Sequence, residues 1–454
     1  MITRCEFLRL ITAALLPSLR AEDKTSTPQG REALAQQFRE GMATPDKIFW
    51  VPELANWLDR PGRDLRGHFE GRVNPPWWSC ANVVEVMVDY MDATGTGIYD
   101  RQLKDLHAGN VLRGSRLPEL AKTLRKEGTW GDEDAGKLDK RMKALDPKRI
   151  HDSEFRNEYL DDSAWWGIAW LKFHERTKDA RYLRTARAIH LHMADNWRKD
   201  GGVSWAEEDD KRDPNAITNS LFVVLSARLH RVTKQKSFLD WAEKTLAWEK
   251  EAKLYDGTAI VDRPGHQGDY WTYNQGAYVG GMEALFQATG KLAYLDEAAA
   301  VAATILAKSG IVREDGILYE KLSTDGWDVG LFKGICSRYF GILSRTLRKR
   351  KLHLEVADGL DRVLSASAAA ISASAKKDAL YPLEWQSQPR AEIHNFNTQP
   401  SPLIAIGAAM GRGGSAGRPM LTSRPMPTPY RTRSWRKGSS RAIALRRWAG
   451  TTSA

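Results

Sequence analysis

Hydrophobic and polar positions divide the chain into two kinds of helical segment. The first kind, as in residues 163–177 and 275–290, is rich in small and apolar residues nearly all round, like a helix enclosed by others. The second kind, as in residues 179–197, has apolar residues on one face and charged residues on the other, like an outer helix. Strand-like alternation is limited to possible short hairpins near 201–205 and 315–320. The pattern therefore predicts an all-α fold.

These segments recur at a fixed spacing. Thr177, Thr233 and Thr289 stand 56 residues apart, and an aromatic residue and a leucine follow each at the same offset. An earlier copy surrounds Thr94, and a degenerate later copy surrounds Thr346. An inner and an outer helix repeated in about six copies of this length predict a closed double ring, the (α/α)6 barrel. An open solenoid is the competing architecture, but its inner helices should be less glycine-rich and less apolar.

The positive charge of the chain is concentrated at its C-terminal end. The whole sequence has 68 Lys and Arg against 57 Asp and Glu, a formal net charge of +11. Residues 411–454 hold ten of these basic residues and no acidic one, so the remainder has 58 basic against 57 acidic residues. We therefore predict no nucleic-acid partner, and we interpret 411–454 as a basic, disordered tail rich in Gly, Ser and Pro.

The N-terminal residues have the pattern of a secretory signal. Residues 1–21 have a basic start, a short apolar stretch and a final small residue, which predicts a signal peptide and a secreted or periplasmic protein. Residues 22–410 then form one barrel domain. No later apolar run approaches the length of a membrane span, so we expect no stable membrane insertion. Outside the leader only Cys80 and Cys336 remain, and no CxxC occurs, so no disulfide framework or cysteine zinc site is supported.

The loops that lead into the inner helices carry the candidate chemistry. In a closed barrel these loops meet at one end, where aromatic, amide and charged side chains would line a cup. Aromatic faces cover the apolar C–H side of a pyranose, while amides and carboxylates bond its hydroxyls, so the lining predicts a carbohydrate ligand. About half of the tryptophans would still belong to the core. The side chains expected to bind the sugar are Trp77, Trp78, Asn82, Trp165, Trp205, Asn219, Trp271, Tyr273, Asn274, Gln275, Lys333 and Gln399.

Two adjacent aspartates, Asp161 and Asp162, stand at the entry to the tryptophan-rich helix 163–177. One interpretation is that one of them, or Ser163, caps the helix, where short acceptor side chains and negative charge are favoured. Capping explains one of the two residues but not the pair in this aromatic setting. The second interpretation is that both carboxyls act on a sugar held in the cup.

Further short motifs accompany this pair. The chain contains GG-x-x-W at 201–205, NAITN at 215–219, WTYNQG at 271–276 and FKG at 332–334. Together with the aspartates they resemble glycoside hydrolase family 76, the endo-α-1,6-mannanases, over roughly residues 75–410. The resemblance implies an (α/α)6 barrel with no obligatory cofactor, which hydrolyses α-1,6-mannan backbones with retention of configuration.

The resemblance also implies a role for each aspartate. The paired aspartates of the family match Asp161 as the nucleophile and Asp162 as the acid/base. In retaining glycosidases the two carboxyl groups stand about 5–5.5 Å apart on either side of the scissile bond. Ionisation of Asp161 would raise the pKa of Asp162 by like-charge repulsion, so that one group attacks while the other keeps the proton it donates.

The sequence departs from the family pattern in two regions. Residues 116–157 form a charged, irregular segment that looks longer than usual and could reshape one wall of the cleft. The basic tail begins where a final outer helix should follow residues 401–410, so we expect that helix to be absent and the ring to close poorly.

No metal is expected, because EEDD at 207–210 lacks the spaced ligands of a calcium loop, and His190 and His192 lie on different faces of an outer helix.

Three other functions are compatible with the sequence. A transglycosylase would use the same residues with a sugar instead of water as acceptor. A polysaccharide lyase would need a Tyr, His or Lys base and a neutraliser for a uronate, and the cup loops offer Lys333, Arg338 and several tyrosines. A non-catalytic glycan-binding protein would keep the aromatic cup without needing two adjacent carboxylates. We expect a monomer whose partner is a polysaccharide such as α-mannan.

Overall fold

The computed structural model describes residues 28–59, 62, 64–70, 76–111, 116–144, 155–208, 212–320, 328–374, 381–385 and 396–411. The expected signal peptide, and all of the expected tail except Gly411, lie outside these residues. Within the described residues no helix is long and apolar enough to cross a lipid bilayer.

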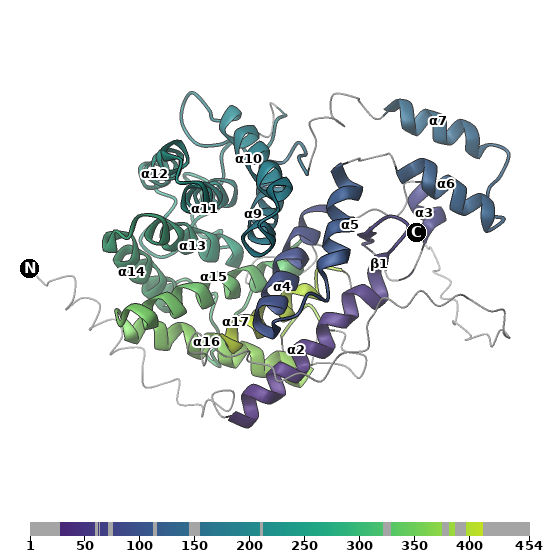
Figure 1. Cartoon of the computed structure of the whole chain (residues 1–454). Coiled ribbons are helices and arrows are strands. Elements are labelled where there is room, and N and C mark those ends of the chain that lie inside the picture. The colour runs from purple at the N-terminus through teal and green to yellow at the C-terminus, as the bar shows by residue number, and fades with distance from the viewer. Residues whose placement is uncertain are drawn as a thin grey trace, which may run out of the picture. The chain divides into compact units, whose positions relative to one another are not determined.

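Six helices form an inner ring in which each helix contacts the next (Figure 1). The order of neighbours is α4, α9, α11, α13, α15 and α17, and α17 closes the ring by contacting α4. Residues 274–286 of α13 are buried without interruption, as expected for a helix that is apolar all round. The predicted (α/α)6 barrel is therefore confirmed, and an open solenoid is excluded. The inner helices are α4 (Trp77–Thr94), α9 (Leu160–Thr177), α11 (Ala216–Thr233), α13 (Thr272–Thr289), α15 (Val329–Arg350) and α17 (Pro400–Met410).

Outer helices pack against the inner ring. α10, α12, α14 and α16 each contact the inner helix that precedes them in the chain. α5 lies between α2 and α10, because Gln102 bonds Asp46 of α2 and His107 bonds Thr185 of α10. The outer helices are α2 (Pro28–Phe49), α5 (Asp100–Val111), α10 (Ala180–Asp195), α12 (Lys236–Glu251), α14 (Leu292–Lys308) and α16 (Leu354–Ser374).

The N-terminal helix α2 occupies the sixth outer position. It contacts both α16 and α17, and Phe38 of α2 packs against Tyr90 of α4 with ring centroids 5.4 Å apart. A Cβ on Gly41 of α2 would lie 2.4 Å from the side chain of Leu403, so the two helices approach closely there. The expectation that the ring closes poorly is therefore wrong, because the outer helix beside α17 comes from the start of the chain and not from a helix after residue 410.

The repeated threonines end the inner helices. Each hydroxyl donates to the carbonyl four residues earlier, with O···O distances of 2.7–2.8 Å, and the next residue turns into the left-handed region. At Thr177, Thr233 and Thr289 the same hydroxyl oxygen also accepts a hydrogen bond from the backbone N–H two residues later. That later residue is the N-cap of the following outer helix. The threonine thus completes one helix and starts the next. The copy at Thr346 differs, because α15 continues to Arg350.

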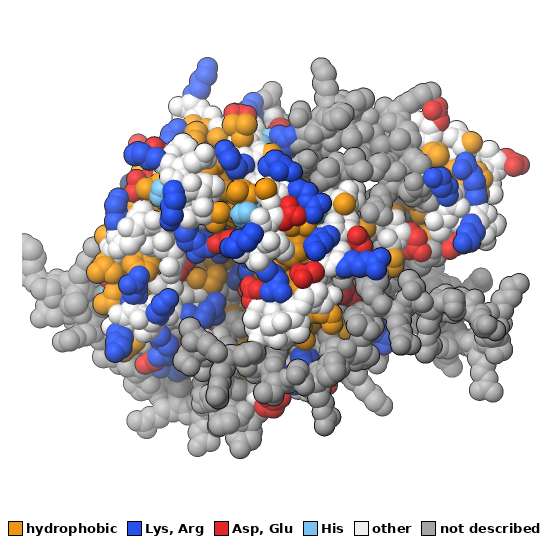
Figure 2. Space-filling model, in the orientation of Figure 1, with side chains coloured by type: hydrophobic (Ala, Val, Ile, Leu, Met, Phe, Trp, Pro, Cys, Tyr) orange, Lys and Arg blue, Asp and Glu red, His pale blue; other side chains and the backbone are white. Residues whose placement is uncertain are grey.

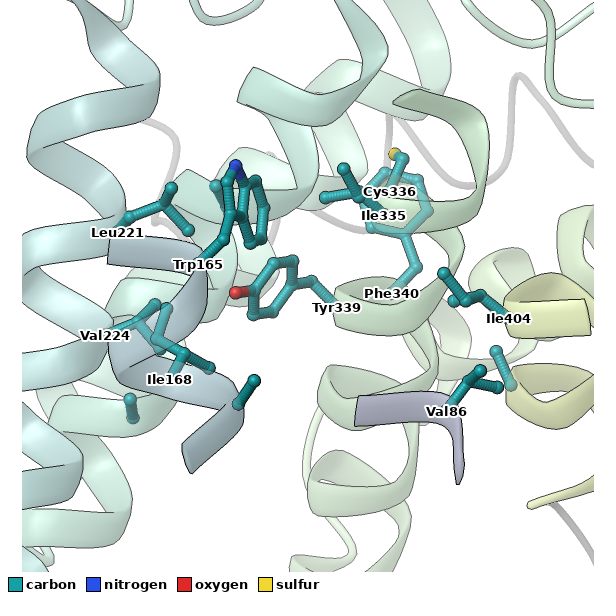
Figure 3. Packing of buried hydrophobic residues seen from close by; sticks show 14 of the residues in the cluster. Val86, Trp165, Ile168, Leu221, Val224, Ile335, Cys336, Tyr339, Phe340 and Ile404 are labelled. Carbon is teal, nitrogen blue, oxygen red and sulfur yellow. The ribbon is translucent and has the colours of Figure 1, made fainter. Parts of the chain in front are cut away.

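Glycines in the quoted motifs let the inner helices approach one another. A Cβ on Gly276 would lie 2.6 Å from the Cα of Cys336, and one on Gly334 would lie 2.7 Å from the Cα of Ser401. Neither position leaves room for a methyl group. The glycines of WTYNQG and FKG are therefore required for close packing of the inner helices, whatever the other residues of these motifs do. Figure 3 shows part of the buried hydrophobic core, in which the side chains of Trp165 and Tyr339 point toward each other.

A small satellite core accompanies the ring near the N-terminus. The hairpin of β1 (Trp50–Val51) and β2 (Asn56–Trp57) precedes α3 (Leu65–Phe69), which contacts α6 (Arg116–Lys126), and α6 contacts α7 (Asp134–Ala144). Within the expected irregular segment 116–157, residues 116–126 and 134–144 are therefore helical, which corrects the expectation for that part. Residues 145–154 of the segment lie outside the described residues. The residues of this core are Val51, Leu54, Leu58, Leu65, Phe69, Leu120 and Leu124.

The expected short hairpins are present as isolated antiparallel bridges. One joins Trp197 to Val203 and another joins Val312 to Leu318. On the face seen in Figure 2, basic and acidic side chains are interspersed over the described helices instead of forming one basic patch. This mixture agrees with the nearly equal numbers of basic and acidic residues outside 411–454.

Candidate active site

The aspartate pair lies inside the first turn of α9, not at its cap. The N-cap residue is Tyr159, which makes no side-chain capping hydrogen bond, and Asp161 and Asp162 follow within the helix. Ser163 bonds the loop, because its hydroxyl accepts from the Asn157 N–H at 3.0 Å. The positive end of the helix favours both carboxylates, but neither is needed to satisfy the helix terminus as a cap.

The two carboxyl groups have unequal hydrogen bonding. One oxygen of Asp161 accepts from the Asp162 N–H at 2.9 Å, and the other accepts from the indole N–H of Trp205 at 3.2 Å. Among the described residues Asp162 accepts one hydrogen bond of this kind, from the amide of Asn157 at 2.8 Å. Two donors stabilise the ionised form of Asp161 more than one donor stabilises that of Asp162.

Burial dominates the acidity of the pair. It raises the pKa of Asp161 to about 7, against the bonds from Asp162 and Trp205 that lower it. Burial raises the pKa of Asp162 well above its usual range, and the adjacent charge of Asp161 raises it further. Asp161 therefore ionises first, and Asp162 keeps its proton to higher pH.

An aromatic wall surrounds the pair. Trp78 stands 6.0 Å from Trp165 and 6.3 Å from Phe332, measured between ring centroids. Tyr273 stacks on Phe332 at 3.8 Å, and Trp271 meets the same ring edge-on at 5.6 Å. Trp78, Trp205, Trp271 and Tyr273 are partly exposed. Trp165 is buried beneath them, and Trp77 packs against the core rings of Phe155 and Trp166.

Two further carboxylates lie at the aromatic wall, and sequence reasoning missed both. Asp328 precedes α15 and accepts from the indole N–H of Trp78 at 2.9 Å, and its charge raises the pKa of Asp161 and of Asp162. Asp262 accepts from the amide of Asn274 at 3.0 Å. Burial raises the pKa of Tyr273 well above its usual range, and the charges of Asp262, Asp161 and Asp328 add to the shift. Each missed residue is a single acid in a loop, with no local motif to mark it.

Three of the expected sugar ligands instead clamp loops. Asn219, Gln275 and Gln399 are each buried, and each side-chain amide brackets the N–H and C=O of one residue in the preceding loop. This corrects their assignment as ligands for hydroxyls, because both halves of each amide are used on backbone groups that would otherwise be buried unpaired. The brackets are Asn219 with Val203 (2.8 and 3.1 Å), Gln275 with Ile260 (2.8 and 2.8 Å) and Gln399 with Tyr381 (3.1 and 3.2 Å).

Three more expected ligands are buried and make polar contacts with protein groups. The Asn82 oxygen accepts from Arg338 at 2.6 Å, deep in the ring. Lys333 donates to the Leu383 carbonyl at 2.9 Å. Asn274 is buried and positions Asp262. These contacts correct the assignment of Asn82 and Lys333, while Asn274 acts on the site through Asp262. The structure brings together Asp161, Asp162, Trp78, Trp165, Trp205, Trp271 and Tyr273.

Comparison with known proteins places this geometry in a family. The sequence model described as Glycosyl hydrolase family 76 matches residues 142–417. The chain is 29% identical over 235 residues to mannan endo-1,6-alpha-mannosidase DCW1 of Saccharomyces cerevisiae, covering 43% of this chain and 51% of that protein. It is 25% identical over 275 residues to DFG5 of the same yeast, covering 54% and 58%. The chain thus spans about half the length of the curated relatives it matches.

Solved structures share the fold. One is an inactive variant, with two adjacent aspartates replaced by asparagine, of the alpha-1,6-mannanase GH76A of Salegentibacter sp. HEL1_6 in complex with alpha-1,6-mannotriose. It has a TM-score of 0.63 at 20% identity, covering 83% of this chain and 99% of that one. Another is the family 76 mannosidase Bt3792 of Bacteroides thetaiotaomicron, with a TM-score of 0.57 at 17% identity, covering 83% and 98%.

Proposed function

Since the chain belongs to glycosyl hydrolase family 76, we propose that it is a retaining glycoside hydrolase that cleaves α-1,6-mannosidic linkages in mannan-type polysaccharides. Asp161 attacks the anomeric carbon, and Asp162 donates its proton to the leaving oxygen. Asp162 then removes a proton from the water that hydrolyses the mannosyl ester on Asp161.

The observation that carries this proposal is the unequal environment of the two adjacent aspartates. A retaining mechanism needs one ionised and one protonated carboxyl at the same pH. The two hydrogen bonds to Asp161 and the single bond to Asp162 favour that distribution, and burial beside the aromatic wall prevents both groups from ionising together. The Salegentibacter enzyme, inactive when two adjacent aspartates are replaced together, supports a catalytic role for such a pair.

The lining of the cup supports a neutral sugar as substrate. Trp78, Trp271 and Tyr273 present partly exposed aromatic rings, with the carboxylates of Asp328 and Asp262 beside them. The cation Arg263 also lies at this wall, over the ring of Trp205, and it is paired with Asp262 at 3.5 Å. A uronate would be repelled by these acids, and the cations that a lyase would need, Lys333 and Arg338, bond to protein groups instead. A lyase is therefore the weaker proposal. The yeast and Salegentibacter relatives named for α-1,6-mannan supply the sugar and the linkage.

Asp328 and Asp262 serve this reaction as positioning residues. Asp328 holds the indole of Trp78 at the rim, and its charge helps Asp162 to retain a proton. Asp262, fixed by Asn274, lies near Tyr273. We also propose that the protein is exported, on the pattern of residues 1–21, and that it acts as a monomer.

Product analysis tests the proposal directly. The protein is incubated separately with linear α-1,6-mannan, dextran and a polyuronate, and the products are identified by mass spectrometry and proton NMR. We expect mannose oligomers with α configuration at the new reducing end, and no unsaturated products. New oligomers longer than the starting chains would indicate a transglycosylase. Release from dextran or polyuronate alone would contradict the proposed substrate.

A further inference from the structure

The far ends of the inner helices surround a second hollow. It has a volume of about 380 Å³ and is lined by residues of α4, α9, α11, α13 and α15, all in the C-terminal halves of those helices. The aspartate pair stands at the N-terminal end of α9, so the hollow and the cup lie at opposite ends of that helix. The volume lies within the range of small-ligand sites in proteins.

The lining carries an excess of positive charge. Five Lys or Arg and three Asp or Glu line the hollow, which leaves a net charge of +2. Two of the acids are already paired with lining cations, Asp89 with Lys172 at 2.6 Å and Glu175 with Arg231. The third acid, Glu283, accepts from the hydroxyl of Thr346 at 2.6 Å.

Three lining cations have no close carboxylate partner among the described residues. Arg228 has only a long contact of 3.8 Å with Glu85, a carboxylate that bonds Arg338 at 2.8 Å. Arg345 and Lys349 make no hydrogen bond or ion pair in the described part of the chain. Asp89 and Glu283 lie near Arg345 but form no ion pair with it among the described residues. The side chain of Arg345 is exposed to solvent, as expected if it faces the hollow.

We propose that this hollow binds a phosphate-type dianion, either inorganic phosphate or the phosphate of a small phosphorylated sugar. Guanidinium groups present paired N–H donors that match the oxygens of such an anion, and a charge of −2 balances the lining. Compensation of the helix C-termini is the simpler role for cations at this end. Compensation of the helix C-termini would not require a hollow between the helices. It would also not require that cations from three helices, α9, α11 and α15, line the same hollow. The proposal is independent of the reaction in the cup.

Equilibrium dialysis of the full chain with labelled inorganic phosphate tests the proposal. Chloride keeps the ionic strength constant, and glucose 6-phosphate and glucose are tested as competitors. We expect saturable binding of one phosphate per chain, with no competition from glucose. Stronger competition by glucose 6-phosphate than by unlabelled phosphate identifies a phosphorylated sugar as the preferred ligand, and equal or weaker competition identifies inorganic phosphate.

Variants separate binding from helix compensation. Arg345→Gln should weaken phosphate binding at least about tenfold, since it removes a charged hydrogen-bond donor, and the rim variant Lys349→Gln should weaken it less. Lys308→Gln is the matched control, because Lys308 lies in the last turn of the outer helix α14, away from the hollow, and should not alter binding. Absence of saturable binding, or equal binding by the wild type and by both hollow variants, would overturn the proposal.

Discussion

At the cup end of the inner ring the described charged groups beside the aromatic wall are mostly carboxylates, with Arg263 paired to Asp262, whereas at the other end most are Lys and Arg. The helix macrodipole favours this distribution, because N-termini attract negative charge and C-termini attract positive charge. What differs is the pairing. At the cup, Asp161 and Asp162 are held by neutral donors, and the charge of Asp161 raises the pKa of Asp162. At the hollow, acids neutralise some of the cations and leave Arg228 and Arg345 without a close partner. The comparison indicates that the helix macrodipole favours the sign of the charged side chains at each end of the ring. Ion pairing with neighbouring side chains then determines which of those charges stay available to react or to bind a ligand.

The largest effect is expected at the cup from Asp161→Asn. Loss of the nucleophile should lower kcat on α-1,6-mannan by about 10⁴-fold or more, measured by reducing-sugar release. Glu158→Gln is the matched control, because Glu158 is an exposed acid three residues away and should change kcat less than about threefold. Comparable losses in the two variants would mean that general charge, and not the nucleophile, determines the rate.

The same substitution should stabilise the fold at high pH. The folded state raises the pKa of Asp161 from 3.8 to about 7, so the folded protein binds more protons than the unfolded chain between these values. The wild type therefore loses stability as Asp161 ionises with rising pH, and Asp161→Asn lacks this contribution while it keeps that of Asp162. We expect the variant to gain about 4 kcal/mol in free energy of unfolding over the wild type at pH 8 and nothing at pH 3.5. A gain of equal size at both pH values would contradict the raised pKa.

Gln275→Ala should affect stability more than sugar binding. The substitution leaves the backbone N–H and C=O of Ile260 without their partners, and it should cost about 2–3 kcal/mol of unfolding free energy. Urea unfolding measures this loss, and Gln235→Ala is the control, because the Gln235 side chain is exposed and makes no capping hydrogen bond. Normal stability together with a large rise in KM would restore the assignment of Gln275 as a sugar ligand.

The clamp residues show what the sequence could predict and what it could not. The repeated helices, the closed ring and the aspartate pair were predictable, because periodicity and adjacent motifs are local signals. Asn219, Gln275 and Gln399 were misassigned, because the sequence alone does not distinguish an amide that bonds a sugar from one that bonds the backbone of a loop. Both kinds of amide are expected near the start of an inner helix. Asp328 was missed because only the fold brings it to Trp78, 250 residues away in sequence. The sixth outer helix was sought at the wrong end of the chain for the same reason.

Asp328→Asn should shift the pH profile of the cup. Its charge raises the pKa of both catalytic aspartates, so its removal lowers both values. We expect both limbs of the kcat/KM profile to move to lower pH by about 0.5 unit, because the rising limb follows ionisation of Asp161 and the falling limb follows deprotonation of Asp162. A lower kcat/KM with unmoved limbs would show that Asp328 acts only by holding Trp78.

The smallest effect on the activity of the cup is expected from a substitution in the hollow at the opposite end of the inner ring. Arg345→Gln should leave kcat and KM on α-1,6-mannan within about twofold of the wild type, since Arg345 is near the C-terminal end of α15 and the cup is formed at its N-terminal end. Steady-state kinetics with and without phosphate check this independence. A large change in kcat would mean that the two ends are coupled and that the comparison must be revised.

The central claim is that Asp161 forms the bond to the sugar while Asp162 supplies the proton. The most direct measurement traps the intermediate in the Asp162→Asn variant, using a 2-deoxy-2-fluoromannosyl donor with a leaving group that needs no protonation. Peptide mass spectrometry then locates the label. The account predicts one fluoromannosyl group per chain on the carboxyl of Asp161, released when azide is added because azide attacks without base assistance. A label on any other residue, or no label while the donor is still consumed with retention, would contradict it.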